Sequence, residues 1–224
     1  MVPGHAHLII HRSRSGSPVF RDAIDLHSYV RALADAALSA KVAIHAYALL
    51  PTEVRLLVTP AGPGGLALLM QVAGRRYVRS FNQKYTSTGT PWEGRFRSTV
   101  VEPEPYFLQC LRYVEGSTDA IASSGGGPDF LSSAAHHLGL RVDPLVADHP
   151  ALWGFGNTPF ERHAAYRRFV EEALGVGEVA AILHAALNGW VLGSREFAEA
   201  VADQTGRRAQ RARRGRPKLS SQPR

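Results

Sequence analysis

Hydrophobic residues recur along the chain with two different periods. From Asp22 to Ala40 and from Leu66 to Lys84 they return every three or four residues, which is the spacing of an amphipathic helix. Two short apolar runs, Val42–Leu50 and Glu53–Thr59, are separated only by Pro51-Thr52. Their closeness predicts an antiparallel hairpin between the two helices.

Further elements extend this pattern on both sides of the hairpin. A strand is expected at 5–11, another at 95–101, and a third helix at 105–115. The resulting order is strand-helix-strand-strand-helix-strand-helix. It is typical of a ferredoxin-like α+β sandwich, with an antiparallel sheet, helices on one face and one added helix.

The C-terminal part of the chain follows a joint rich in serine and glycine at 123–128. Beyond that joint the apolar spacing predicts three more helices, at 159–175, 178–189 and 194–203. The last residues cannot bury enough apolar surface to fold alone, so they are expected to be disordered. We therefore predict three segments: a domain at 1–122, a helical extension at 129–204 and a basic tail at 205–224.

Positive charge is concentrated in two places. The formal net charge is +7, and the tail holds eight basic residues and no acidic one, which leaves the first 204 residues near −1. A second group of cations lies in the body of the chain, interleaved with aromatic residues: Arg75, Arg76, Arg79, Lys84, Arg95 and Arg97, with Trp92 among the aromatics. This distribution favours a polyanionic partner.

Composition excludes several other classes of protein. The single cysteine, Cys110, rules out an internal disulfide framework and a thiolate zinc site. No apolar stretch is long enough to cross a membrane, so we expect a soluble, cytoplasmic protein. The adjacent His136 and His137 are expected to be a solvated pair on a helix.

The hairpin carries one unusual feature. Glu53 and Arg55 stand two residues apart on a predicted strand, so both side chains leave the same face of the sheet. One interpretation is a surface ion pair of little energetic weight. The other is that this face once had a different task.

Several stretches together resemble one family, the REP-associated tyrosine transposases, which are bacterial single-strand transposases. The resemblance covers almost the whole chain, and no single segment carries it. Its main segments are VPGHAHLIIHR, AIHAYALLPTEVRLLVTP, GRRYVRSFNQKY, TGTPWEGRFRSTVVE, LQCLRYVE, SSAAHHLG, HAAYRRF, GWVLGSREF and RGRPK.

The resemblance implies a metal-dependent site at the hairpin. In that family a proline is followed by Asn-His-Val-His, a His-hydrophobic-His (HUH) motif whose two imidazoles hold a divalent metal ion. A tyrosine then attacks the scissile phosphate and forms a phosphotyrosine link. Here Glu53 and Arg55 stand at the two histidine positions. Glu53 is the one hairpin residue that can still ligate Mg²⁺ or Mn²⁺, because a guanidinium has no lone pair to offer.

The family's tyrosine matches Tyr113 in LRYVE. The resemblance also implies a third metal-side ligand, an asparagine four residues after the tyrosine, and Ser117 stands at that position here. Two departures at one site predict that metal-dependent cleavage is impaired or lost, and that no cofactor is needed. The sequence leaves open whether the protein is an enzyme; if active, Tyr113 would be the nucleophile.

DNA-binding residues are expected on both basic segments. Arginines with neighbouring aromatics are typical of surfaces that hold single strands, which assigns this role to Arg75, Arg76, Arg79, Arg95, Arg97 and Trp92. In the tail, Arg214, Arg216 and Lys218 resemble a short hook that inserts into a narrow minor groove.

The leading hypothesis is a bacterial transposase-family protein that binds hairpin or single-stranded repeat ends of DNA. Two alternatives remain open: an active tyrosine transposase that nicks and rejoins single-stranded DNA, and an RNA-binding regulator. The sequence decides neither the target sequence nor whether the protein is a monomer or a dimer, nor whether the gene is mobile or domesticated.

Overall fold

The structure is a computed structural model that describes residues 1–116 and 131–210. Its elements in chain order are β1 (Ala6–Arg12), η1 (Arg14–Gly16), α1 (Ala23–Ala40), β2 (Val42–Leu50), β3 (Glu53–Pro60), α2 (Gly65–Tyr85), β4 (Arg97–Val101), α3 (Tyr106–Glu115), β5 (Leu131–Ser132), α5 (Ala134–His137), η2 (Pro150–Phe155), α6 (Pro159–Glu171), α7 (Val176–Asn188) and α8 (Arg195–Thr205). The predicted joint at 123–128 and most of the tail lie outside the described residues.

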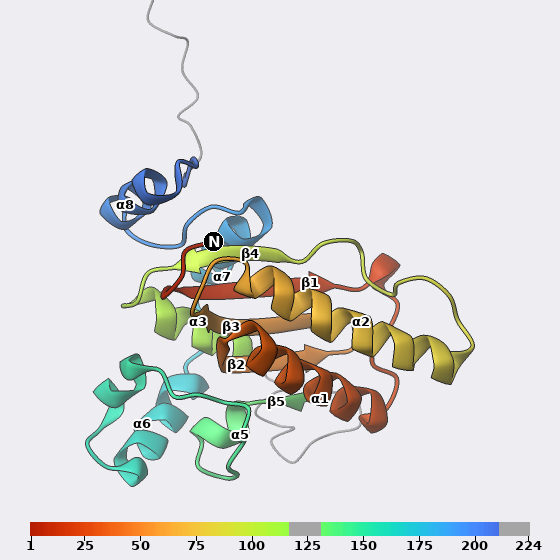
Figure 1. Ribbon diagram of the computed structural model, residues 1–224. Coiled ribbons are helices and arrows are strands. Elements are labelled where there is room, and N and C mark those ends of the chain that lie inside the picture. Colours follow the sequence, from red (N-terminus) through yellow and green to blue (C-terminus); the bar gives the residue numbers. More distant parts are fainter. Residues whose placement is uncertain (117–130, 211–224) are drawn as a thin grey trace, which may run out of the picture.

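A five-stranded sheet organises the molecule, in the order β4-β1-β3-β2-β5 (Figure 1). Every neighbouring pair is antiparallel. The first four strands have the order and connections of a ferredoxin-like α+β sandwich, which confirms the predicted fold class. The short strand β5, which was not predicted, extends the sheet beside β2.

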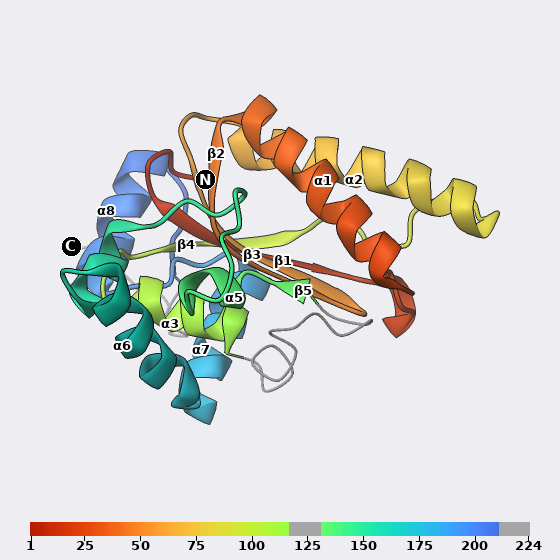
Figure 2. The same ribbon diagram turned by 90° about the horizontal axis from the view of Figure 1, so that it is seen from below.

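Helices α1 and α2 lie together on one face of this sheet (Figure 2). Alternate residues of the strands point at them, including Ile9, Leu56 and Val58, and pack in one core with Leu33 and Leu69 of the two helices. The helices pack on the sheet because the predicted helical spacing gives each of them one apolar stripe to bury.

The opposite face is covered as well, by α3 and α7 and the elements that follow α3 (Figure 2). Leu8 and Leu57 of the sheet share a core with Leu111 of α3, Tyr166 of α6 and Ile182 of α7. Residues of the predicted helical extension therefore pack into the same core as the sheet. No described helix combines the length and apolar composition that a membrane-spanning helix requires.

Element ends differ from the predictions by a few residues. Strand β4 begins at Arg97 because the segment before it lies beside the end of β1 without regular strand pairing. There the Glu93 amide donates to the Arg12 carbonyl at 3.0 Å. Helix α6 ends at Glu171, since Glu172 leaves the helical conformation.

The position of Leu57 makes the core arrangement testable. Leu57 is fully buried in the central strand β3, whereas Leu38 on α1 is 81% exposed. We expect Leu57→Ala to lower the free energy of unfolding by about 2–5 kcal/mol, because it leaves a cavity. The matched variant Leu38→Ala should change it by less than about 0.5 kcal/mol. Urea denaturation followed by circular dichroism measures both, and equal effects would contradict the assigned faces.

Candidate nucleic-acid interface

The period of β3 places three residues of the hairpin on the face that α3 covers. Glu53, Arg55 and Leu57 alternate with Val54 and Leu56, which belong to the core under α1 and α2. The register of the sheet sets Glu53 directly opposite Arg12 of β1. Glu53 and Arg55 therefore share one face of the sheet, as predicted.

Two arginines hold the Glu53 carboxylate. The Nε–H of Arg12 donates to one carboxylate oxygen at 2.7 Å, and the Nε–H of Arg55 donates to the other at 2.6 Å. The Glu53 side chain is only 11% exposed. One negative charge therefore stands between two positive charges, which leaves this part of the site with a net positive charge.

Arg55 also contacts Tyr113, which comes from the last turn of α3. Its guanidinium carbon lies 4.4 Å from the centre of the Tyr113 ring, and its terminal N–H donates to the Tyr113 backbone carbonyl at 3.1 Å. Burial raises the pKa of the Tyr113 hydroxyl, and the charge of Arg55 opposes that rise without cancelling it. Within the described residues the Tyr113 hydroxyl makes no hydrogen bond.

The hairpin donors do not fit a divalent metal ion. Both oxygens of Glu53 already accept hydrogen bonds from arginines, so a cation would have to displace at least one of them. It would then lie beside the permanent positive charge of Arg55, which repels it and offers no lone pair.

Other cations gather beside Arg12. A hollow of about 360 Å³ lies at the edge formed by β1 and the start of β4. Its lining residues are Ile10, His11, Arg12, Glu93, Arg95, Arg97 and Leu187. Arg95 and Arg97 are exposed, and Arg97 pairs across the sheet with Ile10, which points to the α3 face. We call the surface formed by Arg12, Arg55, Arg95 and Arg97 the α3-side arginine face.

The remaining predicted arginines lie elsewhere. Arg75, Arg76 and Arg79 are exposed on the outer side of α2, which covers the opposite face of the sheet (Figure 2). Arg76 forms an ion pair with Asp35 of α1. The prediction of a single basic cluster was therefore wrong, because the sheet separates its two halves.

Trp92 does not have the position expected of a stacking residue. It is 3% exposed and its ring stacks on His11, with the ring centres 4.3 Å apart. Phe20, Tyr29 and Tyr77 surround it. Because this cluster leaves no free face of the indole, the expected DNA-binding role of Trp92 does not fit the structure.

Sequence reasoning missed Arg12. Its place in a plain run of polar residues after the first strand gave no chemical signal, and only the pairing of β1 with β3 brings it to Glu53. Ser117 and the tail residues Arg214, Arg216 and Lys218 lie outside the described residues.

Comparisons with known proteins find distant likeness in structure alone. Neither family models nor curated proteins match the sequence. A solved REP-associated tyrosine transposase bound to a REP hairpin is 14% identical, with a TM-score of 0.48, and the match covers 67% of this chain and 92% of that one. A candidate transposase from Deinococcus radiodurans R1 is 21% identical, with a TM-score of 0.39, and the match covers 51% of this chain and 92% of that one. At these values neither likeness assigns a function to this chain.

The double contact of Glu53 predicts a measurable contribution to stability. Glu53→Gln should lower the free energy of unfolding by about 1–3 kcal/mol, because the amide has one oxygen and can accept from only one of the two arginines. The substitution also leaves Arg55 half-buried without its counter-charge. The exposed Glu93 has no ion pair within the described residues, so Glu93→Gln is the matched control and should be nearly neutral. Urea denaturation is the suitable measurement because it adds no salt; equal effects of the two variants would contradict the arrangement.

Proposed function

We propose that the protein binds the phosphate backbone of single-stranded or hairpin DNA and does not cleave that DNA. The observation that carries this proposal is the contact of Arg55 with both Glu53 and Tyr113. Where the resembled family has a metal ligand beside its tyrosine, this chain has a fixed cation. A guanidinium can bind a phosphate, but it has no lone pair with which to hold the metal ion that would polarise that phosphate.

Charge supports a phosphate-rich partner. Arg12, Arg95 and Arg97 line one hollow, and Arg55 continues that surface towards Tyr113. Arginines present planar, paired donors that match phosphate oxygens. The acidic residues at this surface are Glu53, which is already paired, and Glu93. The basic residues of the tail add sequence-independent attraction for nucleic acid.

The surroundings of Tyr113 support loss of cleavage. A tyrosine hydroxyl becomes a strong nucleophile when a general base removes its proton or when a metal ion lowers its pKa. Burial instead raises the pKa of Tyr113, and its nearest charged neighbour, Arg55, cannot accept a proton. The tyrosine that matches the nucleophile of the resembled family therefore lacks, among the described residues, a hydrogen-bonded base and a set of metal ligands that would activate it.

Cleavage is tested with a panel of labelled hairpin-bearing single strands from the flanks of the gene. We expect wild type and Tyr113→Phe to bind equally in Mg²⁺ or Mn²⁺, and neither to form a covalent protein-DNA adduct. An adduct in the wild type that disappears in Tyr113→Phe would establish an active tyrosine transposase instead, with Glu53 as a working metal ligand.

The binding surface is tested by single arginine substitutions. For a short single strand, Arg97→Ala should weaken binding several-fold and reduce the slope of log affinity against log salt by about 1, because one phosphate contact is lost. The exposed Arg167 of α6 provides the matched control Arg167→Ala, which should change neither quantity.

The two basic surfaces are distinguished by the same assay. Arg79→Ala, on the outer side of α2, should leave the binding of a short strand unchanged, because the sheet separates α2 from the α3-side arginine face. If Arg79→Ala weakens binding and Arg97→Ala does not, the nucleic acid binds on α2 and the proposed surface is wrong.

Comparing DNA and RNA of the same sequence distinguishes the two possible partners. We expect a DNA hairpin with a single-stranded flank to bind more tightly than the RNA of the same sequence, in fluorescence anisotropy at one fixed salt concentration. Tighter binding of the RNA would favour the RNA-binding regulator, because 2′-hydroxyl groups are the feature by which a protein distinguishes the two.

A further inference from the structure

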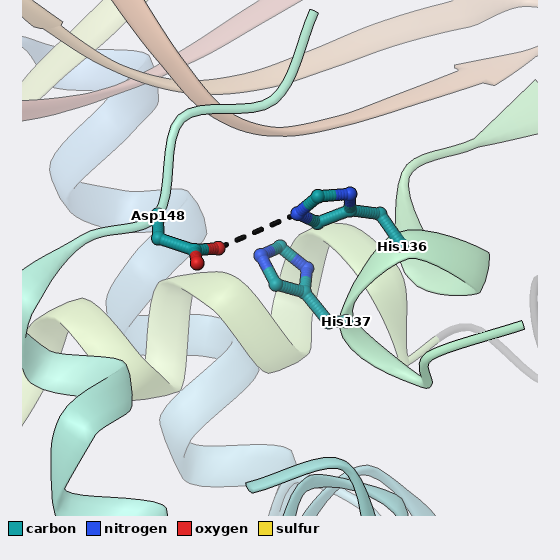
Figure 3. A group of neighbouring side chains, drawn as sticks. All are labelled: His136, His137 and Asp148. Carbon is teal, nitrogen blue, oxygen red and sulfur yellow. Dashed lines mark hydrogen bonds and ion pairs between the residues drawn. The ribbon is translucent and has the colours of Figure 1, made fainter. Parts of the chain in front are cut away.

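A corner rich in histidine lies on the α3 side of the sheet, at the end of α5. His136 and His137 end that helix, and Asp148 lies in the loop before η2 (Figure 3). The sequence predicts a solvated histidine pair, and this is wrong for His137, which is 6% exposed. It is buried because its ring lies between Glu115 of α3, at 3.0 Å, and Tyr166 of α6, with ring centres 5.2 Å apart.

Three potential ligand atoms converge in this corner. Nε2 of His136 lies 3.4 Å from a carboxylate oxygen of Asp148. One ligand atom from each of His136, His137 and Asp148 lies within 4.8 Å of the other two. Ligands around a tetrahedral metal ion with bonds of about 2.0–2.1 Å are roughly 3.4 Å apart, so a small closure of these side chains suffices.

His137 supplies independent evidence that points to a ligand. Its Nδ1 lies 3.0 Å from both oxygens of Glu115, whereas its buried Nε2 has no hydrogen-bond partner among the described residues. Figure 3 shows one nitrogen of this ring turned towards Asp148. A buried imidazole nitrogen without a partner is unfavourable unless another group binds it.

Glu115 fixes the state of that ring. This fully buried carboxylate also accepts hydrogen bonds from the hydroxyl groups of Ser133 and Tyr166. Because all of its partners donate, Glu115 accepts from Nδ1–H of His137. In the neutral imidazole the lone pair is then at Nε2. A carboxylate that orients the far nitrogen of a metal-ligating histidine is the usual outer partner in zinc sites.

For His136, metal binding requires a change of tautomer. Its Nδ1 accepts from the Asp143 backbone N–H at 3.1 Å, so in this state its Nε2 carries the proton and donates to Asp148. A metal ion at Nε2 would take the place of that proton, and Nδ1 would then be protonated. The exchange costs the single hydrogen bond from Asp143, which is small beside coordination by three protein ligands.

We propose that His136, His137 and Asp148 form a binding site for a divalent transition metal ion, zinc in the first place. Two imidazoles and one carboxylate favour zinc over magnesium, which prefers oxygen ligands alone. Three protein ligands leave the fourth position open. A cavity of about 410 Å³ lies beside the site, lined by Arg162 and His163 among others, so a water molecule or an anion can occupy that position.

Metal binding is tested on the full-length, tag-free chain by titration with Co²⁺, followed by competition with Zn²⁺. The wild type should bind one ion per chain with a visible absorption band of a four- or five-coordinate site, and Zn²⁺ should remove the band. His136→Gln and Asp148→Asn should each weaken binding at least as much as the loss of an outer-shell partner does, about 10–100-fold. Asp148 is exposed, so its variant is expected to remain folded.

The matched control is His184→Gln, because His184 is an exposed histidine on α7 outside this corner. Its metal affinity should equal that of the wild type. Thermal unfolding gives a second measurement: Zn²⁺ should raise the midpoint of the wild type and of His184→Gln but not of Asp148→Asn. Equal affinity in the wild type and Asp148→Asn, or a loss of binding in His184→Gln, would overturn the proposal.

Discussion

The two-residue period of β3 is the constraint on which both the core and the candidate interface depend. β3 lies inside the sheet, between β1 and β2, and each face of the sheet carries a hydrophobic core. Val54, Leu56 and Val58 complete the core under α1 and α2, while Glu53 and Arg55 face α3. A slip of one residue would turn the charges into the apolar core, so the register that folds the protein is also the register that builds the site.

The buried carboxylates beside α3 are tolerated because hydrogen-bond donors surround them. At one end of the site Glu53 accepts from Arg12 and Arg55, and Arg55 in turn contacts the ring and carbonyl of Tyr113. Glu115, two residues further along α3, is fully buried and accepts from side chains of other elements. Helix α3 thus joins the α3-side arginine face to the histidine corner, and both rest on hydrogen-bonded carboxylates.

Prediction from the sequence succeeded where the signal was local and failed where it depended on distant neighbours. The helices at 23–40 and 65–85, the hairpin and the shared face of Glu53 and Arg55 follow from periodicity. The grouping of Arg79 with Arg97 failed, because proximity in the sequence says nothing about the sheet between them. The stacking role of Trp92 failed for a similar reason: an aromatic residue in a polar loop can still be drawn into a core.

The sequence by itself determined the α+β order of elements, the excess of positive charge and the placing of Glu53 and Arg55 two residues apart on one strand, since these depend only on residue type and spacing. Only the tertiary structure decided that Arg12 completes the pair at Glu53. It also decided that His137 is buried near Asp148, with an Nε2 that has no hydrogen-bond partner among residues 1–116 and 131–210. These contacts join residues from different elements. Their distances are set by strand pairing and helix packing, which short-range patterns in a single sequence do not encode.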